Sequence, residues 1–117
     1  MQKNKIIELK NTSKSYPIAG KEFMALKNIN LTFDEGEFAG IVGPSGSGKT
    51  TLLNIIGSLD KPTQGEAFVL NKEIKSLSHK EAASLRNFNI GFIFQVFNLL
   101  PVYTVFENVE FALLLQK

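Results

Sequence analysis

The sequence has no cysteine, a single histidine and no long hydrophobic run. Without cysteine the chain has no disulfide, thiol nucleophile or Cys-ligated metal, which fits a reducing interior. The apolar runs are only a few residues long, whereas a membrane-spanning helix needs roughly 20 residues. The start of the chain lacks the apolar core of a signal peptide, because Ile6 and Ile7 are followed at once by Glu8. We therefore expect a protein that stays where it is made and does not cross the bilayer.

The charged residues show no concentration of one sign. Thirteen Lys and Arg and eleven Asp and Glu are spread along the chain and give a net charge of +2. No basic stripe therefore marks a surface for nucleic acid or anionic membrane. His79 stands at a predicted helix start, where we expect a solvated side chain with no role as ligand or base. The apolar fraction of 44% and the length of 117 residues predict one ordinary globular domain.

The pattern of apolar residues predicts several β-strands. Residues 6–9 and 26–33 are expected to form an antiparallel pair, since the second segment has a period near two. Residues 38–42 and 90–94 are short and almost wholly apolar, which is typical of strands buried on both faces of a sheet. Residues 66–70 are a further strand candidate.

Two helices are predicted in the middle of the chain. The first begins at Lys49 and ends near Gly57, where a glycine favours the end of a helix. It is expected to bury four apolar side chains, namely Leu52, Leu53, Ile55 and Ile56. The second follows Ser78 and Glu81, whose spacing of three is that of a capping box, and runs toward Arg86.

A third helix is predicted at the end of the chain. Thr104 and Glu107 repeat the capping-box spacing. The stripe that follows has helical spacing and consists of Val105, Val109, Ala112 and Leu113. We expect this helix to be still running at Lys117, so that the chain ends inside an element whose apolar surface needs a partner.

A glycine-rich motif separates the predicted strand at 38–42 from the helix at Lys49. It fits G-x-x-x-x-G-K-[ST] with Gly43, Pro44, Ser45, Gly46, Ser47, Gly48, Lys49 and Thr50. The glycines let the backbone curl, so that N–H groups and the positive end of the helix dipole face an anion. Lys49 would reach the β and γ phosphates of a nucleotide, and the Thr50 hydroxyl is a suitable oxygen ligand for Mg²⁺. Thr51, next along the helix, completes the predicted nucleotide-binding set.

Residues 43–54 and 92–95 resemble the ATP-binding cassette (ABC) ATPases, and the resemblance covers the whole chain. Within that family, residues 54–65, 98–101 and 107–109 look like the lipoprotein-releasing and macrolide-export branch. The resemblance implies an α/β fold with a phosphate-loop NTPase core that is only partly present. In it, an N-terminal antiparallel β portion would join part of a largely parallel sheet, and residues 1–117 would be the N-terminal part of one nucleotide-binding domain.

The resemblance also implies roles for residues outside the glycine loop. Tyr16, 27 positions before Gly43, would be the flat platform on which adenine stacks; the alternative is an ordinary tyrosine at a strand end. Gln95 would meet Mg²⁺ and the attacking water, and with Lys49 it makes up the predicted catalytic pair; it could instead simply end a buried strand. An apolar contact surface for a transmembrane subunit, or part of the core, is expected at Phe97, Leu100, Val102 and Tyr103.

Some residues that hydrolysis requires in the family are not found in this sequence. The family resemblance calls for an acidic pair after an apolar strand, a serine-glycine-glycine-glutamine signature and a late histidine. The only aspartates are Asp34, in a predicted turn, and Asp60, in a predicted loop. We therefore expect either the front of a longer gene or a shortened chain, which binds ATP and Mg²⁺ without turnover.

Three functions remain open from the sequence. The first is an ATPase subunit that pairs with a second copy and with a transmembrane permease for export or lipoprotein release, at the cytoplasmic face of the cell membrane. The second is a nucleotide-binding fragment without turnover. The third is another phosphate-loop enzyme, such as a small kinase or GTPase. Tyr16, Gln95 and the lack of an Asn-Lys-x-Asp tetrad argue against the third.

Overall fold

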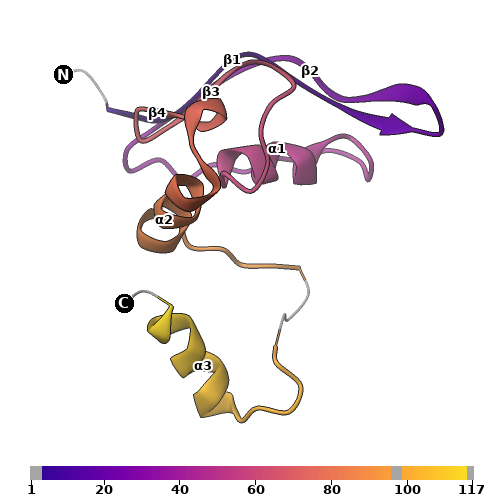
Figure 1. The fold of residues 1–117 in the computed structure, drawn as a ribbon. Coiled ribbons are helices and arrows are strands. Elements are labelled where there is room, and N and C mark those ends of the chain that lie inside the picture. The colour runs from indigo at the N-terminus through magenta and orange to yellow at the C-terminus, as the bar shows by residue number, and fades with distance from the viewer. Residues whose placement is uncertain (1–3, 96–98, 116–117) are drawn as a thin grey trace.

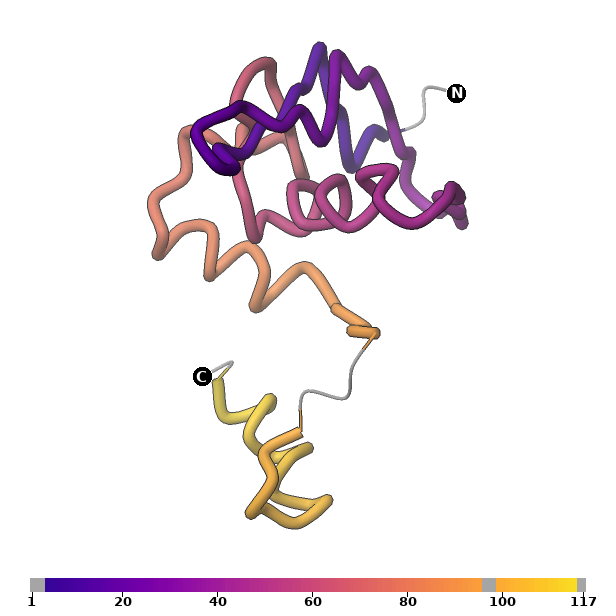
Figure 2. The backbone as a smooth tube through the Cα atoms, turned by 90° about the vertical axis from the view of Figure 1, so that its right-hand side faces the viewer, coloured from indigo at the N-terminus to yellow at the C-terminus, as the bar shows by residue number. Residues whose placement is uncertain are grey.

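The computed structural model describes residues 4–95 and 99–115 and combines a sheet with three α-helices. The elements in chain order are β1 (Lys5–Ile18), β2 (Lys21–Asp34), α1 (Lys49–Ile56), β3 (Gln64–Val69), β4 (Lys72–Glu73), the 3-10 turn η1 (Ile74–Ser76), α2 (His79–Asn89) and α3 (Val105–Leu114). Figures 1 and 2 show α1 lying against one face of the sheet, with α2 next to it and α3 apart from the sheet.

The sheet has the strand order β2-β1-β3-β4, with every pairing antiparallel in the described part of the chain. The predicted antiparallel pair is confirmed, and both strands are longer than expected because β1 and β2 continue into a hairpin. The hairpin turn contains Ala19 and Gly20, both with positive φ, as tight hairpin turns require. In β1, Leu9 is buried toward α1 and pairs with Leu31 on one side and Ala67 on the other.

The core lies between the sheet and α1. Its buried apolar residues come from β1, β2, β3, α1, η1, the residue after η1 and α2. They are Leu9, Leu26, Leu52, Ile55, Ala67, Val69, Ile74, Leu77, Ala82 and Leu85. The predicted start and end of α1 are confirmed, with Gly57 at its C-cap. The prediction that Leu53 points inward is wrong: its side chain is 53% exposed, whereas Ile55 is 0% exposed. Leu53 is one residue off the buried face that Leu52 and Ile55 define.

The strands predicted at residues 38–42 and 90–94 are not present as regular strands. Phe38, Val42 and Ile93 are almost wholly exposed. A strand needs a hydrogen-bonded neighbour, and neither segment belongs to the sheet that the described residues form. The expectation of a largely parallel sheet is therefore wrong for residues 4–95 and 99–115, while the N-terminal antiparallel β portion is confirmed.

Both predicted capping boxes are confirmed. The Ser78 hydroxyl accepts a hydrogen bond from the N–H of Glu81, and Thr104 and Glu107 form the same pair at the start of α3. A capping box determines where a helix begins and not where it ends. The observed α2 continues past Arg86 to Asn89. The Arg86 guanidinium donates to the carbonyl of Ser58 at 2.7 Å, which ties α2 to the end of α1.

The C-terminal apolar surface is mainly exposed. The stripe predicted on α3 has no buried residue, and Val102 and Tyr103 are exposed while Leu100 is half-buried. Phe97 and Lys117 lie outside the described residues. The prediction that the last helix still runs at Lys117 is wrong, because α3 ends at Leu114 and Leu115 is its C-cap. In the part of the chain that the structure describes, none of the helices has the length and apolar character to span a membrane.

Candidate functional site

The glycine-rich loop lies against the backbone of β2. Gly48 has φ +97°, and a Cβ there would come within 2.7 Å of the Ala25 carbonyl oxygen, so a side chain at this position is excluded twice over. A Cβ on Gly43 would meet the Ser47 hydroxyl oxygen at 2.8 Å. The N–H of Ser47 donates to the Pro44 carbonyl at 3.2 Å and closes the turn. The loop is therefore curled, as the motif predicts.

The start of α1 presents unshared backbone donors to this loop. Its N-cap is Gly48, and among the described residues no side chain caps it and no acidic residue occupies its first turn. The first turn of such a helix carries free N–H groups and a partial positive charge, which favours an anion. The Lys49 ammonium donates to the carbonyls of Gly43 and Pro44, the second at 3.0 Å, so it lies over the loop. Two positive features thus converge on one place.

A cleft of about 470 Å³ brings most of the predicted residues together. Its described lining consists of Phe23, Ala25, Ser45, Gly46, Gly48, Lys49, Thr50, Thr51 and Gln95. Thr50 and Gln95, the two predicted Mg²⁺ ligands, come from distant parts of the sequence and line the same space. A hydroxyl and an amide oxygen are the hard ligands that Mg²⁺ accepts alongside water and nucleotide oxygens. The donor set therefore fits a magnesium-bound nucleotide.

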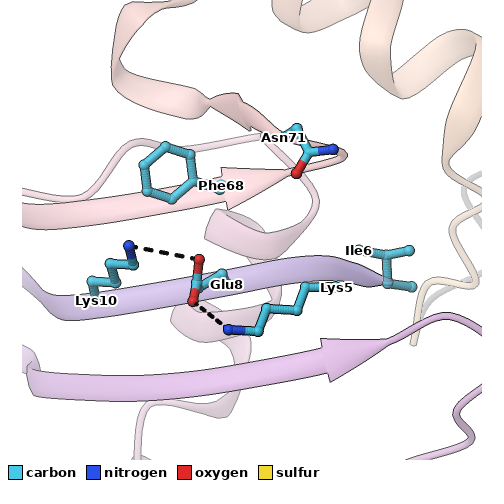
Figure 3. A pocket seen from close by; sticks show the side chains of 6 residues that line it. All are labelled: Lys5, Ile6, Glu8, Lys10, Phe68 and Asn71. Atoms are coloured by element: carbon cyan, nitrogen blue, oxygen red, sulfur yellow. Dashed lines mark hydrogen bonds and ion pairs between the residues drawn. The ribbon is translucent and has the colours of Figure 1, made fainter. Parts of the chain in front are cut away.

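Two further cavities are not lined by the glycines of the loop. A larger cleft of about 830 Å³ is also lined by Thr50 and Gln95, but its other walls are mainly apolar side chains of α1, β1, β3 and the 89–94 segment. Figure 3 shows a cavity of about 270 Å³ on the outer face of β1 and β3. Its two lysines share one carboxylate, because Glu8 lies 3.2 Å from the ammonium of Lys5 and 3.8 Å from that of Lys10. Of these three cavities, the 470 Å³ cleft is the one whose described lining combines residues 45–48 of the loop with the start of α1.

Tyr16 is held beside the cleft and does not line the 470 Å³ space. Its hydroxyl donates to Oδ2 of Asp60 at 3.1 Å, and the Lys14 ammonium lies 5.2 Å from the centre of its ring. The tyrosine is half-buried, so its aromatic ring is fixed by neighbours from β1 and from the loop after α1. Its role as an adenine platform stays a prediction.

Asp60 connects the loop after α1 to β1. Partial burial raises the pKa of Asp60, but hydrogen bonds from Lys14, the Lys61 N–H and Tyr16, with the charge of Lys14, outweigh it and lower the pKa below the ordinary 3.8. Lys14 Nζ and Asp60 Oδ1 are 3.1 Å apart. Since the folded form holds the charged carboxylate more favourably, the stabilisation is present above the unfolded pKa and is lost as pH falls through the folded pKa.

An Asp60→Asn variant tests this linkage. We expect it to be less stable than the parent chain at pH 6 to 7, and we expect the difference to shrink as pH falls below about 4. Urea unfolding of both proteins between pH 3 and 7 measures the difference. Lys14→Met removes the partner of Asp60, so it should also reduce the pH-dependent part of the free energy of unfolding. A difference that stays constant across the range would contradict the ion-pair explanation.

Sequence reasoning missed Phe23 and Ala25, which form one wall of the cleft. The predicted strand began at Leu26, so neither residue was considered. One signal could have found Phe23: once the hairpin turn is placed at Ala19 and Gly20, Phe23 pairs with Tyr16 across it. Of the residues predicted from position 43 to position 51, all line the cleft except Gly43, Pro44 and Ser47.

The curled loop, the open helix start and the mixed α/β architecture define a phosphate-loop nucleotide-binding fold. The sequence model described as "ABC transporter" matches residues 26–117. The chain belongs to the ABC transporter family of ATP-binding domains.

Relatives and solved structures agree with this assignment. The chain is 51% identical over 109 residues to the uncharacterized ABC transporter ATP-binding protein MJ0796 of Methanocaldococcus jannaschii, covering 93% of this chain and 46% of that protein. It is 50% identical over 97 residues to the lipoprotein-releasing system ATP-binding protein LolD 1 of Rhodopirellula baltica, covering 83% and 42%. A dimeric structure of MJ0796, described as a post-hydrolysis state bound to ADP and Pi, superposes with a TM-score of 0.89 at 50% identity, covering 95% and 48%. The chain therefore spans about half the length of these relatives.

Proposed function

We propose that residues 1–117 form the N-terminal part of the nucleotide-binding domain of an ABC transporter ATPase subunit. The observation that carries the proposal is the cleft in which the glycine loop, Thr50 and Gln95 meet. Backbone N–H groups and Lys49 would bind the phosphates of ATP, and Thr50 with Gln95 would hold Mg²⁺. The metal would neutralise phosphate charge when bound. Tyr16 would stack on adenine.

The proposal includes partners and location. The complete subunit would pair with a second copy and with a transmembrane permease, and it would work at the cytoplasmic face of the membrane. Support for pairing comes from the dimeric structure of MJ0796, and support for lipoprotein release or export comes from the name of the LolD relative. The exposed Val102, Tyr103 and α3 offer apolar surface that such a partner would cover.

A second candidate, nucleotide binding without turnover, rests on the placement of the two aspartates. Asp34 ends β2 and Asp60 is engaged by Lys14 and Tyr16, and neither is among the residues that line the 470 Å³ cleft. In the described lining of that cleft there is no carboxylate to orient an attacking water. Phosphoryl transfer depends on positioned charge and water as well as on nucleotide capture.

We therefore predict that the 117-residue chain binds Mg-ATP but releases no phosphate above a protein-free control. The measurement is the ratio of bound to hydrolysed ATP, from equilibrium binding and steady-state phosphate release on the same preparation. A chain extended through its natural downstream sequence is expected to hydrolyse ATP, with Lys49→Ala as the contamination control. Turnover by the 117-residue chain that depends on Lys49 would show that these residues suffice for catalysis. A lack of Lys49-dependent binding would remove the proposed function itself.

A further inference from the structure

Phe23 is a large apolar side chain that borders the 470 Å³ cleft. It is on β2, is 52% exposed, and lines the same cleft as the glycine loop and the start of α1. Of the described residues that line this cleft, Phe23 is the only aromatic one. Ala25, two positions further along the strand, also lines the cleft and continues the wall with a small side chain. The cleft thus has a polar side built from the loop and an apolar side built from β2.

The apolar wall is held at a fixed distance from the phosphate-binding loop. The close approach of Gly48 to the Ala25 carbonyl sets the spacing between β2 and the start of α1. A ligand whose phosphates are bound by the loop and Lys49 would extend its remaining part along this wall. In a nucleotide that remaining part is the ribose and base, whose flat faces pack favourably on aromatic rings.

Phe23 and Tyr16 lie directly opposite each other in the β1–β2 ladder. Opposite residues in an antiparallel pair place their side chains on the same face. Tyr16 is anchored through its hydroxyl to Asp60 and carries the Lys14 ammonium near its ring, whereas Phe23 borders the cleft itself. Of the two aromatic rings, Phe23 is therefore the one that reaches the space next to the phosphate loop.

We propose that Phe23 contacts the nucleoside part of the bound nucleotide and so makes the site favour a nucleoside triphosphate over a bare polyphosphate. The proposal rests on the proposed nucleotide-binding function of the loop and adds a residue to it. Because stacking uses the face of the base, it strengthens binding of ATP without affecting how the phosphates are held.

The experiment compares two ligands that share the phosphate chain, Mg-ATP and magnesium tripolyphosphate, by titration calorimetry. Phe23→Ala is expected to weaken Mg-ATP binding by about 5- to 150-fold, the range for losing one aromatic stacking contact. It should leave tripolyphosphate binding unchanged. Ile18→Ala is the matched control, since Ile18 is an exposed apolar residue of the same hairpin that does not line the cleft. It should affect neither ligand.

Tyr16 variants separate direct contact from indirect effects. Tyr16→Phe should bind ATP nearly as well as the parent chain, while Tyr16→Ala should lose affinity because the ring is gone. If Phe23 contacts the nucleoside itself, Phe23→Ala should lower ATP affinity further in the Tyr16→Ala background. Circular dichroism checks that each variant is folded.

Several results would overturn the proposal. Unchanged ATP affinity in Phe23→Ala would do so, as would an equal loss for both ligands, which would mean that Phe23 only supports the hairpin. The absence of any added loss in the Tyr16→Ala background would assign the effect to Tyr16 alone. If neither ligand needs Lys49, the proposed function fails and this inference fails with it; Lys49-dependent binding of both ligands with no effect of Phe23 would reject the inference alone.

Discussion

Lys49→Ala is expected to lower the affinity for Mg-ATP by about 10- to 150-fold, which corresponds to the roughly 1.5 to 3 kcal/mol of charged hydrogen bonds. The expectation follows from its position, because its ammonium lies over the carbonyls of the glycine loop, where the phosphates would be bound. Titration calorimetry with Mg-ATP measures the change. Replacing Lys49 removes the one lysine that lines the cleft in the described residues.

The matched control for that variant is Lys80→Ala. Lys80 is an exposed lysine in the first turn of α2, outside the cleft, so its replacement should leave ATP affinity unchanged. Comparable affinities for Lys49→Ala and the parent chain, with folding intact by circular dichroism, would refute the assignment of the loop.

Ile55→Ala is expected to lower the free energy of unfolding by about 2 to 5 kcal/mol. Ile55 is the fully buried residue of α1 and packs in the core between α1 and the sheet. The truncated side chain would leave a cavity that a helix fixed at both ends cannot close. Since small domains have only about 5 to 15 kcal/mol of stability, this is a large share of the total.

Leu53→Ala provides the comparison on the same helix. Its side chain is 53% exposed, so we expect a loss of about 1 kcal/mol or less. Urea unfolding followed by circular dichroism gives both values. Equal losses for the two variants would show that the buried face of α1 is not the one described.

The helices were predicted well because their signals are local. The capping boxes at Ser78 and Thr104 involve residues three positions apart, and the structure forms both. The same locality explains the error at Leu53: an apolar residue next to the buried stripe looks the same in the sequence as one inside it. Only packing against the sheet separates the two.

Strands depend on neighbours that the sequence does not specify. The segments at 38–42 and 90–94 have the composition of buried strands, but the described residues give them no ladder partner. The β1–β2 pair was predictable because its two strands are joined by a short turn. The pairing of β1 with β3 was not, since it joins residues as far apart in the sequence as Ile7 and Val69.

The candidate site likewise combines features with a local sequence signal and features that depend on distant parts of the chain. The glycine loop and Lys49 could be predicted because the motif is continuous and its chemistry follows from residue type. Phe23 could not be identified without the hairpin register, and its place in the cleft depends on the approach of Gly48 to β2. The joint position of Thr50 and Gln95 was implied by the family resemblance and is visible in the lining of the cleft.

The arrangement of β1 between β2 and β3 has a consequence for how the chain folds. The β1–β2 hairpin closes through Ala19 and Gly20, so it can form early and at little entropic cost. Joining β3 to β1 instead closes a loop of about 50 residues that contains the glycine loop and α1, and this slower step completes the core around Ile55. We therefore expect nucleotide binding to appear only in the last phase of refolding, after the hairpin has formed.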